Sequence, residues 1–264
     1  MRILLFVVIC YAVVCLLAFL FQRKLMYLPS SGAPAYPDGA PGLVEIALEA
    51  DDGTALAAWY WPGERRGTVV LFHGNAGHRG HRLFWMRRIH AMGYGAFVLD
   101  YRGYGGSDGA PSEPGFYLDG DAAIRWVRGN AEGSLVIAGT SIGGGVAIEM
   151  ARRSEPAGLL LTDTAPSTTD IAKNAYPFLP VEAFLKDRFD SRKKIGEIAA
   201  PVLILHGEAD RIVPIALGRA LFDLATEPKR FVSFPDVGHN DVWDAADGAY
   251  WKSVADFLDE SLAP

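Results

Sequence analysis

Cysteine is nearly absent from this sequence. The chain has two, Cys10 and Cys15, and both lie in one apolar stretch near the N-terminus. The residues that follow that stretch therefore hold no disulfide and no cysteine metal site. Cysteine usage consequently gives no indication of the redox compartment of the globular part.

Basic residues are also scarce in the globular part. The chain has 25 Lys and Arg against 31 Asp and Glu, a formal net charge of −6. Its first 30 residues hold three bases and no acid, which leaves 22 bases against 31 acids and a charge of −9 for the rest. Such a balance does not attract a phosphate backbone, so we expect no nucleic-acid partner. The sequence also lacks internal repeats and low-complexity tracts.

Charge is missing from Ile3 to Phe21 altogether. As a helix this stretch would span about 28 Å, close to the thickness of a bilayer's hydrocarbon core. We therefore predict a single-pass transmembrane anchor over residues 1–24. A cleaved signal peptide and a buried core helix are the alternatives, although no small-x-small cleavage site follows the apolar run. Basic residues flank both ends, so the sequence does not indicate which membrane face carries the domain.

A linker is predicted over residues 25–43, which are rich in Pro, Gly, Ser and Ala, and one domain over residues 44–264. Alternating or short apolar runs predict strands at 44–48, 54–61, 68–72, 95–99, 134–138, 158–161, 201–205 and 230–234. Helices are predicted at 83–92, 119–128, 144–153, 215–225 and 242–258. After an antiparallel start at Asp52-Gly53, strands alternate with helices, which is typical of a mostly parallel sheet with helices on both faces.

The stretch Gly139-Thr140-Ser141-Ile142-Gly143 stands between a predicted strand and a predicted helix. G-x-S-x-G in that context is the pattern of a nucleophile elbow, in which a tight turn lifts the serine hydroxyl out of the sheet. The glycines are expected because a side chain at either place would collide with the neighbouring strand or helix. A phosphate-binding loop does not fit, since no Lys-Ser or Lys-Thr follows.

A serine hydroxyl needs a base, and the base needs an acid that orients it. Polar clusters follow the predicted strands at their carboxyl ends, where ligands bind in such sheets. Among six histidines, His239 follows the last strand and lies downstream of Ser141 and of an acid, the chain order that this fold requires. We predict His239 as general base and Asp210 as the acid. Glu208 and Asp163 are the alternatives for the acid.

Two backbone N–H groups are expected to stabilise a developing oxyanion. Ile142 opens the helix after the serine, and Asn75 lies in the loop after the strand that ends at Phe72. His73 and His206 precede glycines and are expected to shape turns. We interpret His78, His81 and His90 as solvent-exposed. Asp100, Arg102 and Ser107 are interpreted as a structural hydrogen-bonded loop.

Taken together, these motifs resemble the α/β-hydrolase superfamily and, within it, the Bem46-like, ABHD13-type serine hydrolases. The resemblance covers nearly the whole chain and rests on these stretches: residues 21–29 (FQRKLMYLP), Asp52-Gly53 with Trp59-Tyr60, residues 72–77 (FHGNAG), residues 100–107 (DYRGYGGS), residues 139–144 (GTSIGG), residues 206–210 (HGEAD) and residues 238–241 (GHND). It implies a triad of Ser141, Asp210 and His239, oxyanion donors Asn75 and Ile142, and a minimal cap at about residues 166–199. Thr164-Ala165-Pro166 departs from the Glu-Ser-Pro-like stretch of many relatives, which affects the expected substrate pocket.

The sequence therefore predicts an α/β-hydrolase fold with a small cap and an N-terminal transmembrane helix. The predicted function is a membrane-anchored serine hydrolase that cleaves carboxylic esters or acyl thioesters through an acyl-enzyme on Ser141, without a metal or an organic cofactor. A serine peptidase of the same fold and a catalytically inactive membrane-tethered scaffold are the alternatives. A dehalogenase or an epoxide hydrolase would need an aspartate at position 141.

Overall fold

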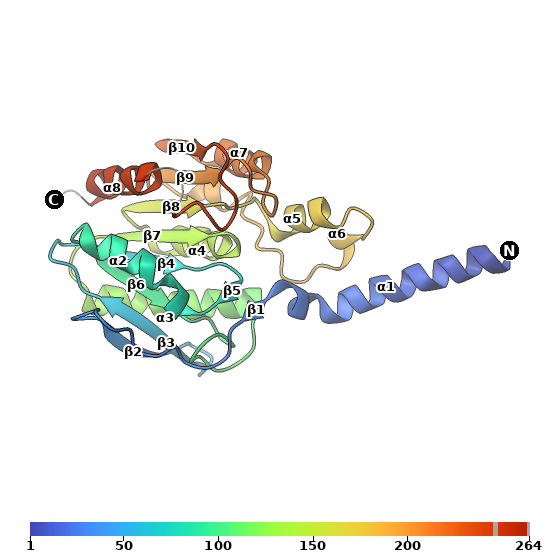
Figure 1. Cartoon of the computed structure of the whole chain (residues 1–264), viewed down its shortest axis with the longest axis horizontal. Coiled ribbons are helices and arrows are strands. Elements are labelled where there is room, and N and C mark those ends of the chain that lie inside the picture. Colours follow the sequence, from blue (N-terminus) through green and yellow to red (C-terminus); the bar gives the residue numbers. More distant parts are fainter. Residues whose placement is uncertain (245–247, 263–264) are drawn as a thin grey trace.

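The computed structural model describes residues 1–244 and 248–262 and is built on one eight-stranded sheet (Figure 1). The strand order is β10-β9-β8-β7-β4-β6-β3-β2. Strand β3 pairs antiparallel with β2 and with β6, and all the other pairs are parallel. The strands are β2 (Val44–Glu49), β3 (Ala55–Trp61), β4 (Thr68–Phe72), β6 (Gly95–Leu99), β7 (Leu135–Thr140), β8 (Gly158–Thr162), β9 (Val202–Gly207) and β10 (Lys229–Phe234). The predicted mostly parallel sheet is confirmed.

Helices cover both faces of this sheet, as predicted. One face carries α3 (Glu113–Asn130), α4 (Ile142–Ser154) and α7 (Ile215–Leu224), and the other carries α2 (Leu83–Ala91) and α8 (Ala249–Ser261). Successive residues of the central strands point to opposite faces: Val70 and Phe72 pack under α3 and α4, whereas Val69 and Leu71 pack with α2 and α8. Because both faces are buried, these strands read as continuous apolar runs.

Three predicted helix starts differ from the structure. Helix α3 begins at Glu113 rather than at 119, because the Ser112 hydroxyl accepts the Gly115 N–H at 3.2 Å and caps the helix. The sequence predicts a last helix from 242, but residues 241–244 form turns and α8 begins at Ala249. Residues 245–247 of that prediction lie outside the described residues. The elbow helix α4 begins at Ile142, two residues before the predicted start.

The cap, defined here as residues 166–199, connects β8 to β9. It contains α5 (Thr168–Ala175), α6 (Val181–Phe184) and the short 3-10 helix η2 (Ile195–Glu197). Ser167 caps α5 by accepting the Asp170 N–H. Pro177 and Pro180 stand between α5 and α6, where a proline lacks the N–H that a continuing helix would need.

The first helix, α1 (Arg2–Met26), extends away from the domain, and α5 and α6 lie at the same end of the sheet as α1 (Figure 1). It is long and apolar enough to cross a membrane by length and composition. The predicted linker after it is mostly irregular, yet it is bound to the domain. Strand β1 (Leu28–Pro29) pairs with β5 (Ala76–Gly77), and Tyr27 is buried against Phe116.

Candidate active site

Ser141 lies in the sharp turn between β7 and α4. Its backbone is left-handed, with φ 55° and ψ −126°, a conformation that costs about 1–3 kcal/mol for a residue with a side chain. The flanking glycines make this turn possible. A Cβ on Gly143 would collide with the Phe72 carbonyl oxygen, and one on Gly139 would lie 2.5 Å from the Cβ of Ala147. Both collisions are those expected from the sequence.

His239 stands beside this serine, in the loop that follows β10. Its Nε2 lies 3.1 Å from the Ser141 Oγ, and its Nδ1 lies 2.6 Å from Oδ2 of Asp210. An imidazole that donates from Nδ1 to a carboxylate presents a free lone pair at Nε2. The structure thus brings all three residues of the predicted triad into one hydrogen-bonded chain.

Asp210 is held rigidly by the turn after β9. Its Oδ1 accepts the N–H groups of Ile212 and Val213, both at 2.8 Å, which leaves Oδ2 for the imidazole. Glu208, the nearest alternative in sequence, is exposed and accepts the hydroxyl of Ser233 at 2.6 Å. Geometry therefore favours Asp210 over Glu208 as the partner of His239.

Asp163, the second alternative, is also close to the imidazole. It follows β8, is fully buried, and has a left-handed backbone (φ 48°). Its Oδ1 accepts the Gly207 N–H at 3.0 Å, while its Oδ2 has no hydrogen-bond partner among the described residues. One ligand atom from each of Asp163, Asp210 and His239 lies within 4.8 Å of the others. Two carboxylates therefore face one ring, where the sequence indicated a choice between them.

Such a set could ligate a metal ion. In the structure Nδ1 of His239 is engaged with Asp210 at 2.6 Å. A metal ion there would displace the proton shared by that pair. The absence of a metal from the predicted mechanism stays a prediction.

The charges around the ring set its proton affinity. Burial lowers the pKa of His239, but the hydrogen bond and charge of Asp210, together with the charge of Asp163, outweigh it and raise that pKa above the usual value. Burial in turn raises the pKa of Asp163 to about 7, although the Gly207 N–H and the His239 charge oppose the shift. An imidazole with a raised pKa accepts a proton from a hydroxyl more readily.

The loop after β4 lies against the serine. A Cβ on Gly74 would be 3.5 Å from the Ser141 Cβ, in ordinary contact. The next residue, Asn75, is fixed through its carbonyl oxygen, which accepts the Leu28 N–H at 2.9 Å and the Tyr104 hydroxyl at 2.8 Å. Ile142 opens α4, and the first N–H groups of a helix have no acceptor within it. The two predicted oxyanion donors thus lie on the two chain segments that flank Ser141.

The other histidines are placed as follows. His73 and His206 are buried and bond backbone carbonyl groups, His73 that of Gly74 and His206 that of Val213, in keeping with a role in shaping turns. Burial lowers the pKa of His73 to about 3, so its ring stays neutral. The prediction of solvent exposure is confirmed for His81 and wrong for His78 and His90, which are half-buried; His90 stacks on Trp61 at 4.4 Å.

The loop at Asp100 is held by hydrogen bonds, as the sequence indicated for Asp100 and Ser107, whereas the Arg102 side chain pairs with Asp52 and Asp119 instead. Asp100 accepts the Gly106 N–H, and its own carbonyl accepts the Ser107 hydroxyl. Its main partner, the buried Arg79, does not stand out in the sequence. Arg79 follows β4, and the loop at Asp100 follows the neighbouring strand β6. Because these strands are parallel and adjacent, the sequence could have indicated that the two loops meet.

Fold and site together define an α/β-hydrolase of the serine hydrolase type. A family model described as "Serine aminopeptidase, S33" matches residues 63–189. The chain is 37% identical over 227 residues to an uncharacterised protein of Mycobacterium tuberculosis, covering 83% of this chain and 81% of that protein. It is 36% identical over 208 residues to the protein bem46 of Schizosaccharomyces pombe, covering 75% of this chain and 69% of bem46. The chain belongs to the Bem46-like family of α/β-hydrolases.

Solved structures of low sequence similarity share the fold. The esterase Pf2001 of Pyrococcus furiosus superposes with a TM-score of 0.76 at 16% identity, covering 90% of this chain and 98% of the esterase. The architecture is thus maintained where most residues differ.

Proposed function

We propose that this protein cleaves carboxylic esters or acyl thioesters through an acyl-enzyme on Ser141. The observation that carries the proposal is the continuous hydrogen-bonded chain from Ser141 through His239 to Asp210, with distances of 3.1 and 2.6 Å. An exposed surface serine has no such base and no strained turn behind it. The Pyrococcus neighbour is named an esterase, which supports the same reaction class for this chain.

In the proposed mechanism, His239 Nε2 takes the hydroxyl proton while Ser141 Oγ attacks the acyl carbon. The N–H groups of Asn75 and Ile142 hold the oxyanion of the tetrahedral intermediate. Protonated His239, stabilised by Asp210, gives the proton to the leaving alcohol or thiol as the acyl–oxygen or acyl–sulfur bond breaks. Water then attacks the acyl-enzyme with His239 as base, and the acid is released as Ser141 recovers its proton.

The test uses the full chain in detergent micelles. We expect covalent labelling by a fluorophosphonate and turnover of p-nitrophenyl butyrate, and we expect both to be lost in Ser141→Ala. The matched control is Ser253→Ala on α8, whose hydroxyl only bonds the Ala249 carbonyl. Absence of labelling in the native chain, or labelling that persists in Ser141→Ala, would contradict the catalytic assignment and favour an inactive scaffold.

A serine peptidase is the second candidate, because the matching family model is described as a serine aminopeptidase. The same triad can expel an amine, so the leaving group must be tested directly. We expect the full chain to hydrolyse butyryl p-nitrophenyl ester and not the p-nitroanilide of an amino acid with a free amine. Preference for the anilide would overturn the esterase proposal and leave Ser141 as the nucleophile.

We further propose that α1 anchors the protein in a membrane as a single span, with the catalytic domain formed by residues 44–264. The proposal is supported by the length of α1 and by its side chains, none of which is buried within its most apolar stretch. Expressed from its own sequence, the protein should sediment with membranes, resist alkaline carbonate and keep a mass near 28.6 kDa. A shorter, soluble form would indicate a cleaved signal peptide instead.

A further inference from the structure

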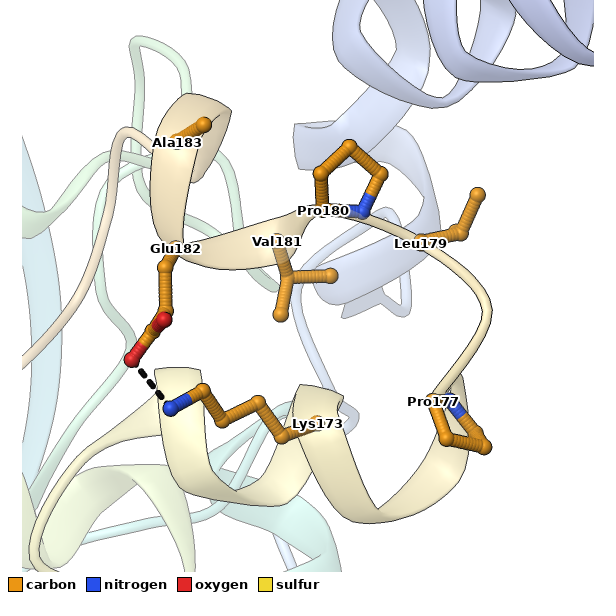
Figure 2. Close-up of a pocket in the computed structure, with 7 residues that line it drawn as sticks. All are labelled: Lys173, Pro177, Leu179, Pro180, Val181, Glu182 and Ala183. Atoms are coloured by element: carbon orange, nitrogen blue, oxygen red, sulfur yellow. Dashed lines mark ion pairs between the residues drawn. The ribbon is translucent and has the colours of Figure 1, made fainter.

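The cap carries an exposed apolar tip, residues 175–181 (AYPFLPV), which contains no charge. Tyr176 is 52% exposed and Phe178 is 61% exposed, and prolines stand at 177 and 180. Beside the tip, between α5 and α6, is a hollow of about 380 Å³ (Figure 2). Its walls are apolar except for Lys173 and Glu182, which pair with each other across it. Clustered exposed side chains of this kind mark an interaction surface.

This tip rests on the apolar helix α1. The Tyr11 hydroxyl donates to the Phe178 carbonyl oxygen at 2.7 Å, and Phe19 meets Phe184 edge to face at 6.2 Å. Tyr11 carries the one hydroxyl group between Ile3 and Phe21. At about 1.5 Å per residue, Tyr11 lies roughly 15 Å from Phe21 along the helix axis, near the middle of the apolar run. The tip therefore lies beside the part of α1 that a bilayer would surround.

A polar collar lies closer to the domain and separates it from the tip. Gln22 accepts the Lys186 N–H at 2.7 Å and donates to the Phe184 carbonyl at 3.3 Å. Arg23 pairs with Asp187 at 2.7 Å. Charged and amide groups gather where a helix leaves the hydrocarbon for the headgroups. The collar thus indicates the membrane surface, with the tip on the lipid side of it.

Several backbone polar groups of the tip are paired within the protein, as lipid requires. The two prolines have no N–H. The Leu179 N–H bonds the Tyr176 carbonyl, and the Val181 N–H bonds that of Leu179. The Pro180 carbonyl accepts the Ala183 N–H, and the Phe178 carbonyl accepts Tyr11.

We propose that the tip of the cap inserts into the hydrocarbon core beside α1, so that the cap and the helix form one membrane-binding surface. The inference rests on the proposed anchoring by α1. The apolar run from Ile3 to Phe21 matches the thickness of the hydrocarbon core. Because the Phe178 carbonyl is bonded to Tyr11, near the middle of that run, a membrane-spanning α1 carries Tyr176 and Phe178 into the hydrocarbon core.

The test measures depth by fluorescence quenching in phosphatidylcholine vesicles. Cys10→Ala and Cys15→Ala remove the native thiols, and an environment-sensitive NBD label is attached at Phe178→Cys. Two control labels are placed at Val8→Cys, inside α1, and at Glu132→Cys, an exposed loop residue after α3. With lipids that carry a doxyl group on the acyl chain, we expect loss of most of the emission at 178 and at 8, and unchanged emission at 132.

The outcomes separate this proposal from the one on which it rests. Quenching at 8 without quenching at 178 leaves the anchor standing and overturns the insertion of the cap. No quenching at either position overturns the anchoring, and the insertion with it. Tyr11→Phe, which removes one oxygen atom, should reduce the quenching at 178 because the Phe178 carbonyl then lacks a partner in lipid. Native-like hydrolysis of p-nitrophenyl butyrate confirms that each variant is folded.

Discussion

Replacing Asp210 by asparagine tests the site at its most constrained point. Oδ1 of Asp210 accepts two backbone N–H groups and Oδ2 faces His239 Nδ1. An asparagine that keeps its oxygen toward the two backbone donors must turn its NH₂ group toward Nδ1. The imidazole then has to accept at Nδ1 and carry its proton on Nε2, where it can no longer take the proton of Ser141. In the other orientation of the asparagine amide, its NH₂ group would face the N–H groups of Ile212 and Val213, and these donors would lose their acceptor.

The expected loss in kcat/KM is about 10³- to 10⁴-fold, or roughly 4–5.5 kcal/mol of transition-state stabilisation, the magnitude found when a triad carboxylate becomes an amide. Initial rates with p-nitrophenyl butyrate measure it, and circular dichroism shows that the variant is folded. Glu208→Gln is the matched control, since the Glu208 carboxylate accepts the Ser233 hydroxyl and makes no other side-chain hydrogen bond among the described residues, and we expect its rate to stay within about twofold. An Asp210→Asn enzyme that retains a tenth of the native rate, or a larger loss in Glu208→Gln, would refute the assignment.

Three further results are expected. Because His239 must be neutral to act as a base, kcat/KM should fall as the pH drops through the raised pKa of His239. Asp163→Asn removes a charge that favours the imidazolium, so it should move this acid limb of the pH–rate profile to lower pH. An unchanged profile would show that the charge of Asp163 does not affect the pKa of His239. Gly143→Ala should lower the free energy of unfolding by about 3 kcal/mol, measured by urea titration, because the new methyl group meets the Phe72 carbonyl, which is backbone and cannot turn aside. Gly129→Ala, where nothing lies within 4 Å, should instead be neutral or stabilise α3 by about 0.5 kcal/mol, and equal losses in both would contradict the steric reasoning.

The order of strands and helices and the position of the elbow could be predicted from the sequence. The strands could be predicted because each is an apolar run bounded by glycine or polar residues. The need for glycine at 139 and 143 could be predicted because the turn at Ser141 is too tight for side chains there. The predicted range of α3 is too short although the signal for its true start is present. Ser112 followed by Glu113 and Pro114 is a good helix start, and the glycine at 115 obscures it.

The partner of the base could not be decided in the same way. Glu208 and Asp210 follow the same strand two residues apart, and only the turn that gives Oδ1 the N–H groups of Ile212 and Val213 sets them apart. Asp163 comes to the ring from a neighbouring strand, a meeting that depends on sheet register rather than on local pattern. The binding of residues 25–43 to the domain is also non-local, since Leu28 and Pro29 pair with Ala76 and Gly77. The composition of this stretch by itself indicates a linker.

Strand β1 joins the chain that follows α1 to the loop next to Ser141. The Leu28 N–H donates to the Asn75 carbonyl, and the Asn75 side chain donates to the Met26 carbonyl. The Ser30 N–H donates to the Gly77 carbonyl. A protease that cut the chain after Ser30 would therefore separate the loop next to Ser141 from the segment that is bonded to it. If α1 anchors the enzyme as proposed, release from the membrane by such a cut would also loosen the active site.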